Sequence, residues 1–209
     1  GELILVSVSG GQNSVGLAHM LQQGVVADHK KLLFTPALLW IDEGSVFGFD
    51  TDKRRNNARE GFNLMTQFGF PIHIALLEDY NRDQVTVYSS PEEIRYSDNL
   101  SDSVTRTFTS LKDKSAREGL LLQLRRQVML GSAKALGCGK ILTGETGTRL
   151  AVELMSSVVS GVGGGLASRV GFRDTRDNGV ELLRPMREVS SKEVSLYCVF
   201  TGLSTWHGQ

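Results

Sequence analysis

Near its start the sequence reads Glu2-Leu-Ile-Leu-Val-Ser-Val-Ser-Gly-Gly-Gln-Asn-Ser14. The first part is a mostly apolar run without alternation, which is typical of a strand buried on both faces of a parallel sheet. Two glycines follow, and helical spacing then begins, so free backbone N–H groups should lie at the positive end of a helix dipole. We therefore predict a phosphate or pyrophosphate site, formed by Ser9, Gly10, Gly11, Gln12, Asn13 and Ser14. The alternative is a plain strand-to-helix turn, capped by Asn13 or Ser14.

The same alternation of strand and helix continues along the chain. Further strands are expected at 37–41, 72–77, 140–143 and around 182–183, and helices at 14–23, 54–68, 115–136, 148–159 and 190–200. Residues 78–114 are polar and weakly periodic, so we expect a long, partly mobile excursion with one short helix near Pro91. This order predicts an α/β fold, a five-stranded parallel sheet with helices on both faces. We expect a single domain over residues 1–209, either a fragment or the ordered part of a longer chain.

The composition restricts the possible partners. The 209 residues contain 23 Lys and Arg against 23 Asp and Glu, so no global field attracts nucleic acid and any RNA contact must be local. Two basic groups are candidates for contacts with the RNA backbone, although charge runs of this kind are often only solvated faces: Lys53, Arg54 and Arg55, and then Arg125 and Arg126. No apolar window is long enough to cross a bilayer, and we expect no membrane partner.

The cysteines carry no sign of a metal site. The chain has two, Cys138 and Cys198, far apart in sequence. Two isolated thiols do not build a disulfide framework or a structural zinc site, and we expect both to pack in the core. Their small number suits a reducing compartment and a cytoplasmic protein.

The phosphate-site segment resembles the Ser-Gly-Gly-x-Asp-Ser signature of the PP-loop ATP pyrophosphatases. The match covers Ser9, Gly10, Gly11 and Ser14, while Asn13 replaces the aspartate of the family. The resemblance implies a Rossmann-like, adenine nucleotide alpha hydrolase-like domain that holds nucleotide phosphates at this turn. It also implies weakened magnesium binding, because a neutral amide is a poorer ligand for a hard cation than a carboxylate.

Two further segments resemble the tRNA-thiolation branch of this family. Ile41-Asp42-Glu43-Gly44 is similar to an Ile-Asp-Glu-Gly at the end of its second strand, and Thr143-Gly144 is similar to its Thr-Gly-His. The resemblance adds Asp42 and Gly144 to the nucleotide site. The catalytic pattern is broken, however: Glu145 replaces the histidine, and Thr148 and Arg149 replace two aspartates. An arginine cannot hold Mg²⁺ or act as a base at neutral pH, and residues 114–120 lack the Cys-x-x-Cys of active members.

The loss of these catalytic residues resembles the pattern in the non-catalytic second subunits of the cytosolic tRNA thiouridylase. The similarity is clearest at Thr148-Arg-Leu-Ala151 and Arg184-Pro-Met-Arg-Glu188, and it includes the glycine-rich residues 161–172. It implies a pseudoenzyme that forms a heterodimer with the catalytic subunit and supports thiolation of the wobble uridine U34 in cytosolic tRNAs. A ubiquitin-like sulfur donor would be reached through that partner. The chain itself would require no cofactor and hold no metal, although ATP, phosphate or pyrophosphate could still bind.

The sequence is also compatible with two other functions. One is an active PP-loop, ATP-dependent tRNA-modifying ligase or sulfurtransferase, with Asp42, Glu43 and Glu145 as substitute metal ligands. The other is a nucleotide-sensing module without an RNA role.

Overall fold

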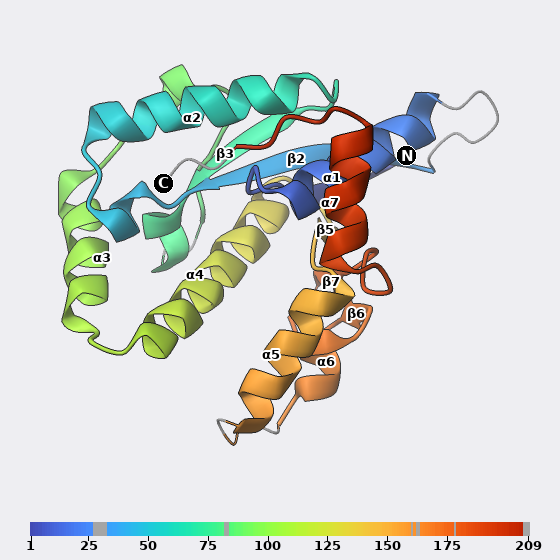
Figure 1. Ribbon diagram of the computed structural model, residues 1–209. Helices are drawn as coiled ribbons and strands as arrows, with labels where there is room; N and C mark the ends of the chain where they lie inside the picture. The colour runs from blue at the N-terminus through green and yellow to red at the C-terminus, as the bar shows by residue number, and fades with distance from the viewer. Residues whose placement is uncertain (27–32, 82–83, 160, 162–163, 178, 207–209) are drawn as a thin grey trace.

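The computed structural model describes residues 1–26, 33–81, 84–159, 161, 164–177 and 179–206. One seven-stranded sheet runs through it in the order β4-β3-β2-β1-β5-β7-β6 (Figure 1). The strands are β1 (Glu2–Ser7), β2 (Phe34–Asp42), β3 (Ile72–Leu76), β4 (Val87–Tyr88), β5 (Lys140–Thr143), β6 (Arg173–Asp174) and β7 (Glu181–Leu183). The five central strands are parallel, whereas β4 and β6 pair antiparallel at the two edges.

Helices cover both faces of this sheet. They are α1 (Gln12–Val26), α2 (Thr51–Thr66), α3 (Asp98–Ser110), α4 (Lys114–Ala135), α5 (Gly147–Val159), α6 (Leu166–Val170) and α7 (Ser191–Phe200), with short 3-10 turns η1 (Gly44–Phe47), η2 (Leu77–Asn81) and η3 (Pro91–Glu93). Apolar residues of α1, α2 and α7 share one core cluster, and those of α3 and α4 share the other. No helix in the described ranges has the length and apolar character needed to cross a membrane.

Strand β1 divides the two cores. Ile4 and Val6 point into the cluster under α1, α2 and α7, whereas Leu5 between them points into the cluster over α3 and α4. Successive side chains of a strand face opposite sides of the sheet, so a strand covered on both sides is apolar at every position. This confirms the interpretation of the first apolar run as a doubly buried central strand.

The prediction of a five-stranded parallel sheet is confirmed for the centre and wrong at the edges. Strands β4 and β6 have two residues each, which is too short for any periodic signal in the sequence. The polar excursion contains η3 at Pro91, as predicted, but also the helix α3, which was not predicted. Leu100, Val104 and Phe108 of α3 recur every four residues, which is the spacing of an amphipathic helix, and the prediction from sequence missed this pattern among the polar residues around it. Of the glycine-rich segment, residues 162 and 163 lie outside the described part.

Candidate functional site

The segment 9–14, predicted to bind phosphate and called the phosphate loop below, lies at the point where the strand order reverses. The chain builds β2 and β3 on one side of β1 and later returns to place β5 and β7 on the other side. In open parallel sheets, ligands bind outside the carboxyl ends of the strands at such a switch point. The carboxyl ends of β1, β2 and β5 bring together Ser9, Asp42 and Gly144. The residues predicted for a nucleotide site from separate motifs therefore share one edge of the sheet.

Hydrogen bonds within the loop fix its shape. The Ser9 backbone N–H donates to Oγ of Ser14 at 3.2 Å, and that hydroxyl donates to the carbonyl of Gly11 at 3.0 Å. Gly10 has a φ of 81°, in the left-handed region that favours glycine. Helix α1 begins directly afterwards at Gln12, and the N–H groups of its first turn have no partner within the helix. Such free N–H groups are what the predicted phosphate site requires, and phosphate binding stays a prediction.

Gly144, the residue directly after β5, packs against the backbone of the phosphate loop. A Cβ atom at Gly144 would lie 3.0 Å from backbone atoms of Asn13 and Ser14, which is tighter than ordinary packing allows. Gly144 is therefore a position of close backbone approach. Asn13 lines the larger of two cavities beside the loop, whereas the side chain of Gln12 faces away and accepts a hydrogen bond from Ser195 of α7 at 2.7 Å.

Trp206 closes the loop from the other side, and no sequence motif points to it. Its backbone N–H donates to the carbonyl of Gly10 at 2.9 Å, and its indole N–H donates to Glu60 of α2 at 2.9 Å. Its ring meets Trp40 edge to face, with centroids 5.1 Å apart. Residues almost two hundred positions apart thus build one wall of the site.

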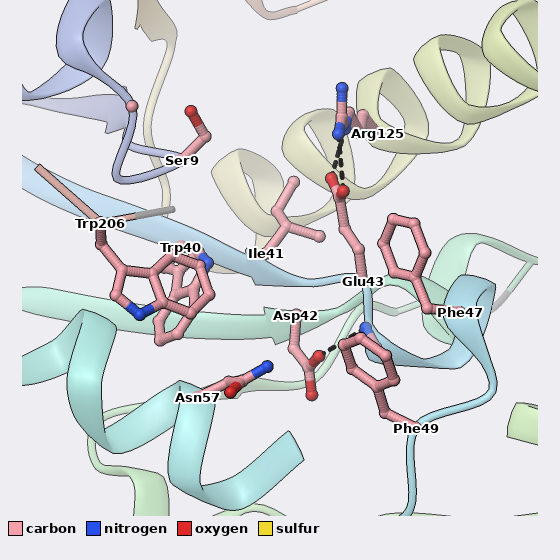
Figure 2. Close-up of a pocket in the computed structure, with 12 residues that line it drawn as sticks. Ser9, Trp40, Ile41, Asp42, Glu43, Phe47, Phe49, Asn57, Arg125 and Trp206 are labelled. Atoms are coloured by element: carbon pink, nitrogen blue, oxygen red, sulfur yellow. Dashed lines mark hydrogen bonds and ion pairs between the residues drawn. The ribbon is translucent and has the colours of Figure 1, made fainter. Parts of the chain in front are cut away.

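A small cavity of about 220 Å³ lies beside the loop at the end of β2 (Figure 2). Four aromatic side chains line it, together with Asn57 and the acids of the Asp42-Glu43 pair: Trp40, Phe47, Phe49 and Trp206. Aromatic walls with a few polar groups are the usual composition of a pocket for a flat organic ring. The predicted phosphate loop therefore adjoins a cavity with both aromatic and charged walls.

Asp42 does not project freely into this cavity. Its Oδ1 accepts from the backbone N–H of Gly44 at 2.8 Å, and its Oδ2 accepts from Nε of Arg54 at 3.0 Å. Arg54 also donates through Nη2 to both oxygens of Glu78 at 2.9 Å. Burial raises the pKa of Asp42, and the charge of Arg54 opposes this rise. Both oxygens of Asp42 are therefore already engaged within the protein.

This geometry corrects the expectation for Arg54 as an RNA contact. Its side chain is 2% exposed, because the two buried carboxylates hold it inside the fold, with the ring of Tyr96 stacked 4.4 Å away. Its neighbours differ: Lys53 is exposed and lies over the Phe49 ring at 3.4 Å, whereas Arg55 is half-buried. The sequence motif Lys53-Arg-Arg55 therefore contributes one exposed cation rather than a basic cluster.

Arg125 and Glu43 stand between two cavities. Arg125 of α4 forms a forked ion pair with the Glu43 carboxylate, and its Nη2 lies 2.6 Å from Oε2 (Figure 2). Both residues line the small cavity and also a second cavity of about 610 Å³. Arg126 lines only the second, where it pairs with Asp174 at 3.0 Å and with Asp177. Both arginines of the second predicted RNA-contact group, Arg125 and Arg126, thus line this cavity, and each has a carboxylate partner.

The cysteines take the places expected of packing residues. Cys138 and Cys198 are free and buried, and burial raises the pKa of both thiols. Among the described residues, no group of three or more His, Cys, Asp and Glu side chains is arranged to hold a metal ion.

The chain has relatives among named proteins. No protein-family model matches the chain. The chain is 32% identical over 94% of its length to "Cytoplasmic tRNA 2-thiolation protein 2" of Danio rerio and 31% identical over 94% to the Xenopus tropicalis protein of that name. The Homo sapiens protein is 27% identical over 94% of the chain. The chain spans about half the length of these relatives, with 47% of the first and 49% of the second covered.

Solved structures with this fold are more distant in sequence. The U34-tRNA thiolase NcsA of Methanococcus maripaludis, solved with its 4Fe–4S cluster, superposes with a TM-score of 0.66 at 14% identity, over 98% of this chain and 58% of that one. Phosphoadenylyl-sulfate reductase of Candida auris gives a TM-score of 0.53 at 11% identity, over 97% and 74%. These likenesses confirm the adenine nucleotide alpha hydrolase-like fold.

Proposed function

Because this chain is homologous over nearly its whole length to the cytoplasmic tRNA 2-thiolation proteins 2, we propose that it is a non-catalytic subunit in the 2-thiolation of the wobble uridine U34 of cytoplasmic tRNAs. Its catalytic partner would be a thiouridylase subunit that carries the metal ligands and reactive cysteines, and that receives sulfur from a ubiquitin-like donor. The location would be the cytoplasm, in keeping with the name of the relatives.

One observation carries the non-catalytic role. The three acids that an active ligase would use as metal ligands each bind an arginine of the chain: Asp42 binds Arg54 at 3.0 Å, Glu43 binds Arg125 through a fork, and Glu145 binds Arg184 at 2.5 Å. A guanidinium is permanently charged and occupies the carboxylate oxygens that a cation would need. The site is therefore neutralised from within, which favours the pseudoenzyme over the active ligase.

Exposed apolar side chains support a protein partner. On α5, Val152, Met155 and Val159 recur at helical spacing and are 65%, 68% and 88% exposed. Large apolar side chains gathered in this way mark interaction surfaces. We assign this surface to the catalytic subunit.

Residual nucleotide binding is compatible with this role. The phosphate loop keeps its hydrogen bonds and its helix N-terminus, and the aromatic cavity adjoins it. We propose that ATP, phosphate or pyrophosphate binds here without turnover, and that the chain requires no cofactor.

Co-purification followed by an activity assay tests the proposal. The full-length protein, tagged in cells, should bring down in equal amount a PP-loop protein that has a Cys-x-x-Cys motif and paired aspartates, together with tRNA. The pair should thiolate tRNA, while the isolated chain with Mg²⁺ and ATP should show no pyrophosphate exchange. Exchange by the isolated chain, abolished in Asp42→Ala, would instead establish the active ligase.

A further inference from the structure

The second cavity is unusually rich in arginine. Three glutamates line it, Glu43, Glu145 and Glu153, against six arginines: Arg125, Arg126, Arg149, Arg169, Arg176 and Arg184. These arginines come from α4, α5, α6 and the segment around β6 and β7, which are distant in sequence. Even with Asp174 and Asp177 behind the wall, six guanidiniums meet five carboxylates. The arginines outnumber the acids, so the cavity has a small excess of positive charge, which attracts an anion.

Two of these arginines form no ion pair with a carboxylate of the described residues. In the part of the chain that the structure describes, the side chains of Arg149 and Arg169 make no hydrogen bond or ion pair, whereas Arg125, Arg126, Arg176 and Arg184 do. Arg176 forms a fork on Asp174, with N–O distances of 2.9 and 2.6 Å. A fork of this kind uses one edge of the guanidinium and leaves its other N–H groups free to bind a ligand.

Buried contacts hold this arginine group in position. Arg184 is 4% exposed on its side chain and donates to the carbonyls of Ser168 and Gly171, on either side of Arg169, at 3.2 and 2.9 Å. Asp174 is 1% exposed and holds both Arg126 and Arg176. The short helix α6 is thus tied to the sheet through a buried guanidinium, and Arg169 is presented from a fixed backbone.

Glu153 is the one carboxylate of the cavity wall without an ion pair among the described residues. It is half-buried, and burial together with the nearby charge of Glu145 raises its pKa, against the effects of Arg184, Arg169 and Arg176. Glu153 follows Arg149 by one helical turn on α5, so the two side chains share one face of that helix. An unpaired acid among arginines repels the same anion that the arginines attract.

We propose that Arg149, Arg169 and Arg176 form a phosphate-binding site in the wall of this cavity. Guanidinium groups match phosphate oxygens in geometry and charge, and the cavity also contains Ser9, Asn13 and Ser14 of the phosphate loop. Its volume of about 610 Å³ lies in the usual range for small-molecule sites. The ligand class is a nucleoside phosphate, either a free nucleotide or one nucleotide of an RNA chain. The RNA form rests on the proposed function, and the free form does not.

Direct binding to the full-length protein tests the site. Inorganic triphosphate and ATP serve as probes for the free form, and unmodified tRNA serves for the RNA form. In the double variant Arg149→Ala/Arg169→Ala, the affinity for any probe that binds at this site should fall about tenfold or more. The reason is that two charge-assisted hydrogen bonds are lost. Glu153→Gln should strengthen the same binding, which general damage to the fold would not do. Arg106→Ala on α3, outside the cavity lining, is the matched control.

A free nucleotide and an RNA chain should give different results in these binding measurements. If RNA is the ligand, the dependence of tRNA affinity on salt should become shallower in the double variant, as expected when phosphate contacts are removed. If a free nucleotide is the ligand, only triphosphate and ATP should lose affinity. Unchanged affinity for all three probes, in a double variant with a normal unfolding curve, would overturn the site. Co-purification with a catalytic subunit is measured separately, so the proposed function can stand or fall independently.

Discussion

Nε of Arg54 lies 3.0 Å from the carboxylate of Asp42, and neither side chain is more than 6% exposed. The same guanidinium binds Glu78, so a single cation pairs with two buried acids at the ends of β2 and β3. We expect Arg54→Met to lower the free energy of unfolding by about 3–5 kcal/mol, because it leaves two buried charges unpaired. Urea denaturation measures the loss. In the triple variant Arg54→Met/Asp42→Asn/Glu78→Gln the loss should be smaller, and an equal loss would show that the charges are not its cause.

Acid stability should depend on Asp174. Burial acts to raise the pKa of this carboxyl, but hydrogen bonds from Arg176 and the charges of Arg126 and Arg176 outweigh burial and lower the pKa to about 2. A depressed pKa stabilises the fold above the unfolded value of 3.8, and this contribution disappears as pH falls from about 4 to about 2. Asp174→Asn should therefore lower the free energy of unfolding by about 2 kcal/mol at pH 7, and by progressively less below pH 4. Denaturation curves of both proteins across this range are the measurement, and a pH-independent difference would contradict the assignment.

Gly10 and Gly11 should respond differently to the same substitution. Gly10 has a φ of 81°, and an added Cβ would lie 3.2 Å from Trp206. At Gly11 the nearest atom would be Oγ of Ser9 at 3.8 Å, an ordinary contact. Gly10→Ala should lower the free energy of unfolding by about 1–2 kcal/mol, because an L-residue in the left-handed region is less stable by about that amount. The same substitution should weaken pyrophosphate binding. Gly11→Ala is the control for stability and should leave the free energy of unfolding close to that of the unsubstituted protein.

Trp206 should govern the mobility of the phosphate loop. Trp206→Ala removes the ring that packs on Gly10 and Trp40 and the indole hydrogen bond to Glu60. We expect faster amide hydrogen exchange in residues 9–14, since local opening is easier where packing contacts are lost. Trp206→Phe keeps an aromatic ring there and should show an intermediate rate. Exchange unchanged in the alanine variant would mean that the loop is rigid without this cover.

The apolar face of α5 should be needed for partner capture and not for folding. Met155 and Val159 are 68% and 88% exposed, so Met155→Glu/Val159→Glu should leave the free energy of unfolding within about 0.5 kcal/mol. The same double variant should lose the catalytic subunit in co-purification, because burying two carboxylates in an interface is costly. A matched double substitution of exposed polar residues, Thr107→Glu/Ser110→Glu on α3, should retain the partner. Retention by the α5 variant would place the interface elsewhere.

The sequence predicts the parts of the fold that rest on local patterns. The doubly buried β1, the turn at Gly10 and the helix start at Ser190, where Ser190 and Glu193 form a capping box, all follow from residues adjacent in the chain. The seating of Trp206 and the burial of Arg54 do not, because each depends on groups brought together by the tertiary fold. Arg54 in particular has the same sequence neighbours as a surface cation, and only Glu78 and Asp42 together make its burial favourable.

The hydrogen bond from Trp206 to Gly10 has a consequence for how the protein is made. Gly10 leaves the ribosome almost two hundred residues before Trp206, which packs against it. A contact of such long sequence separation forms late, since the intervening chain must be ordered first. During synthesis the phosphate loop therefore remains uncovered, and its final shape is acquired only after the sheet on both sides of β1 is complete.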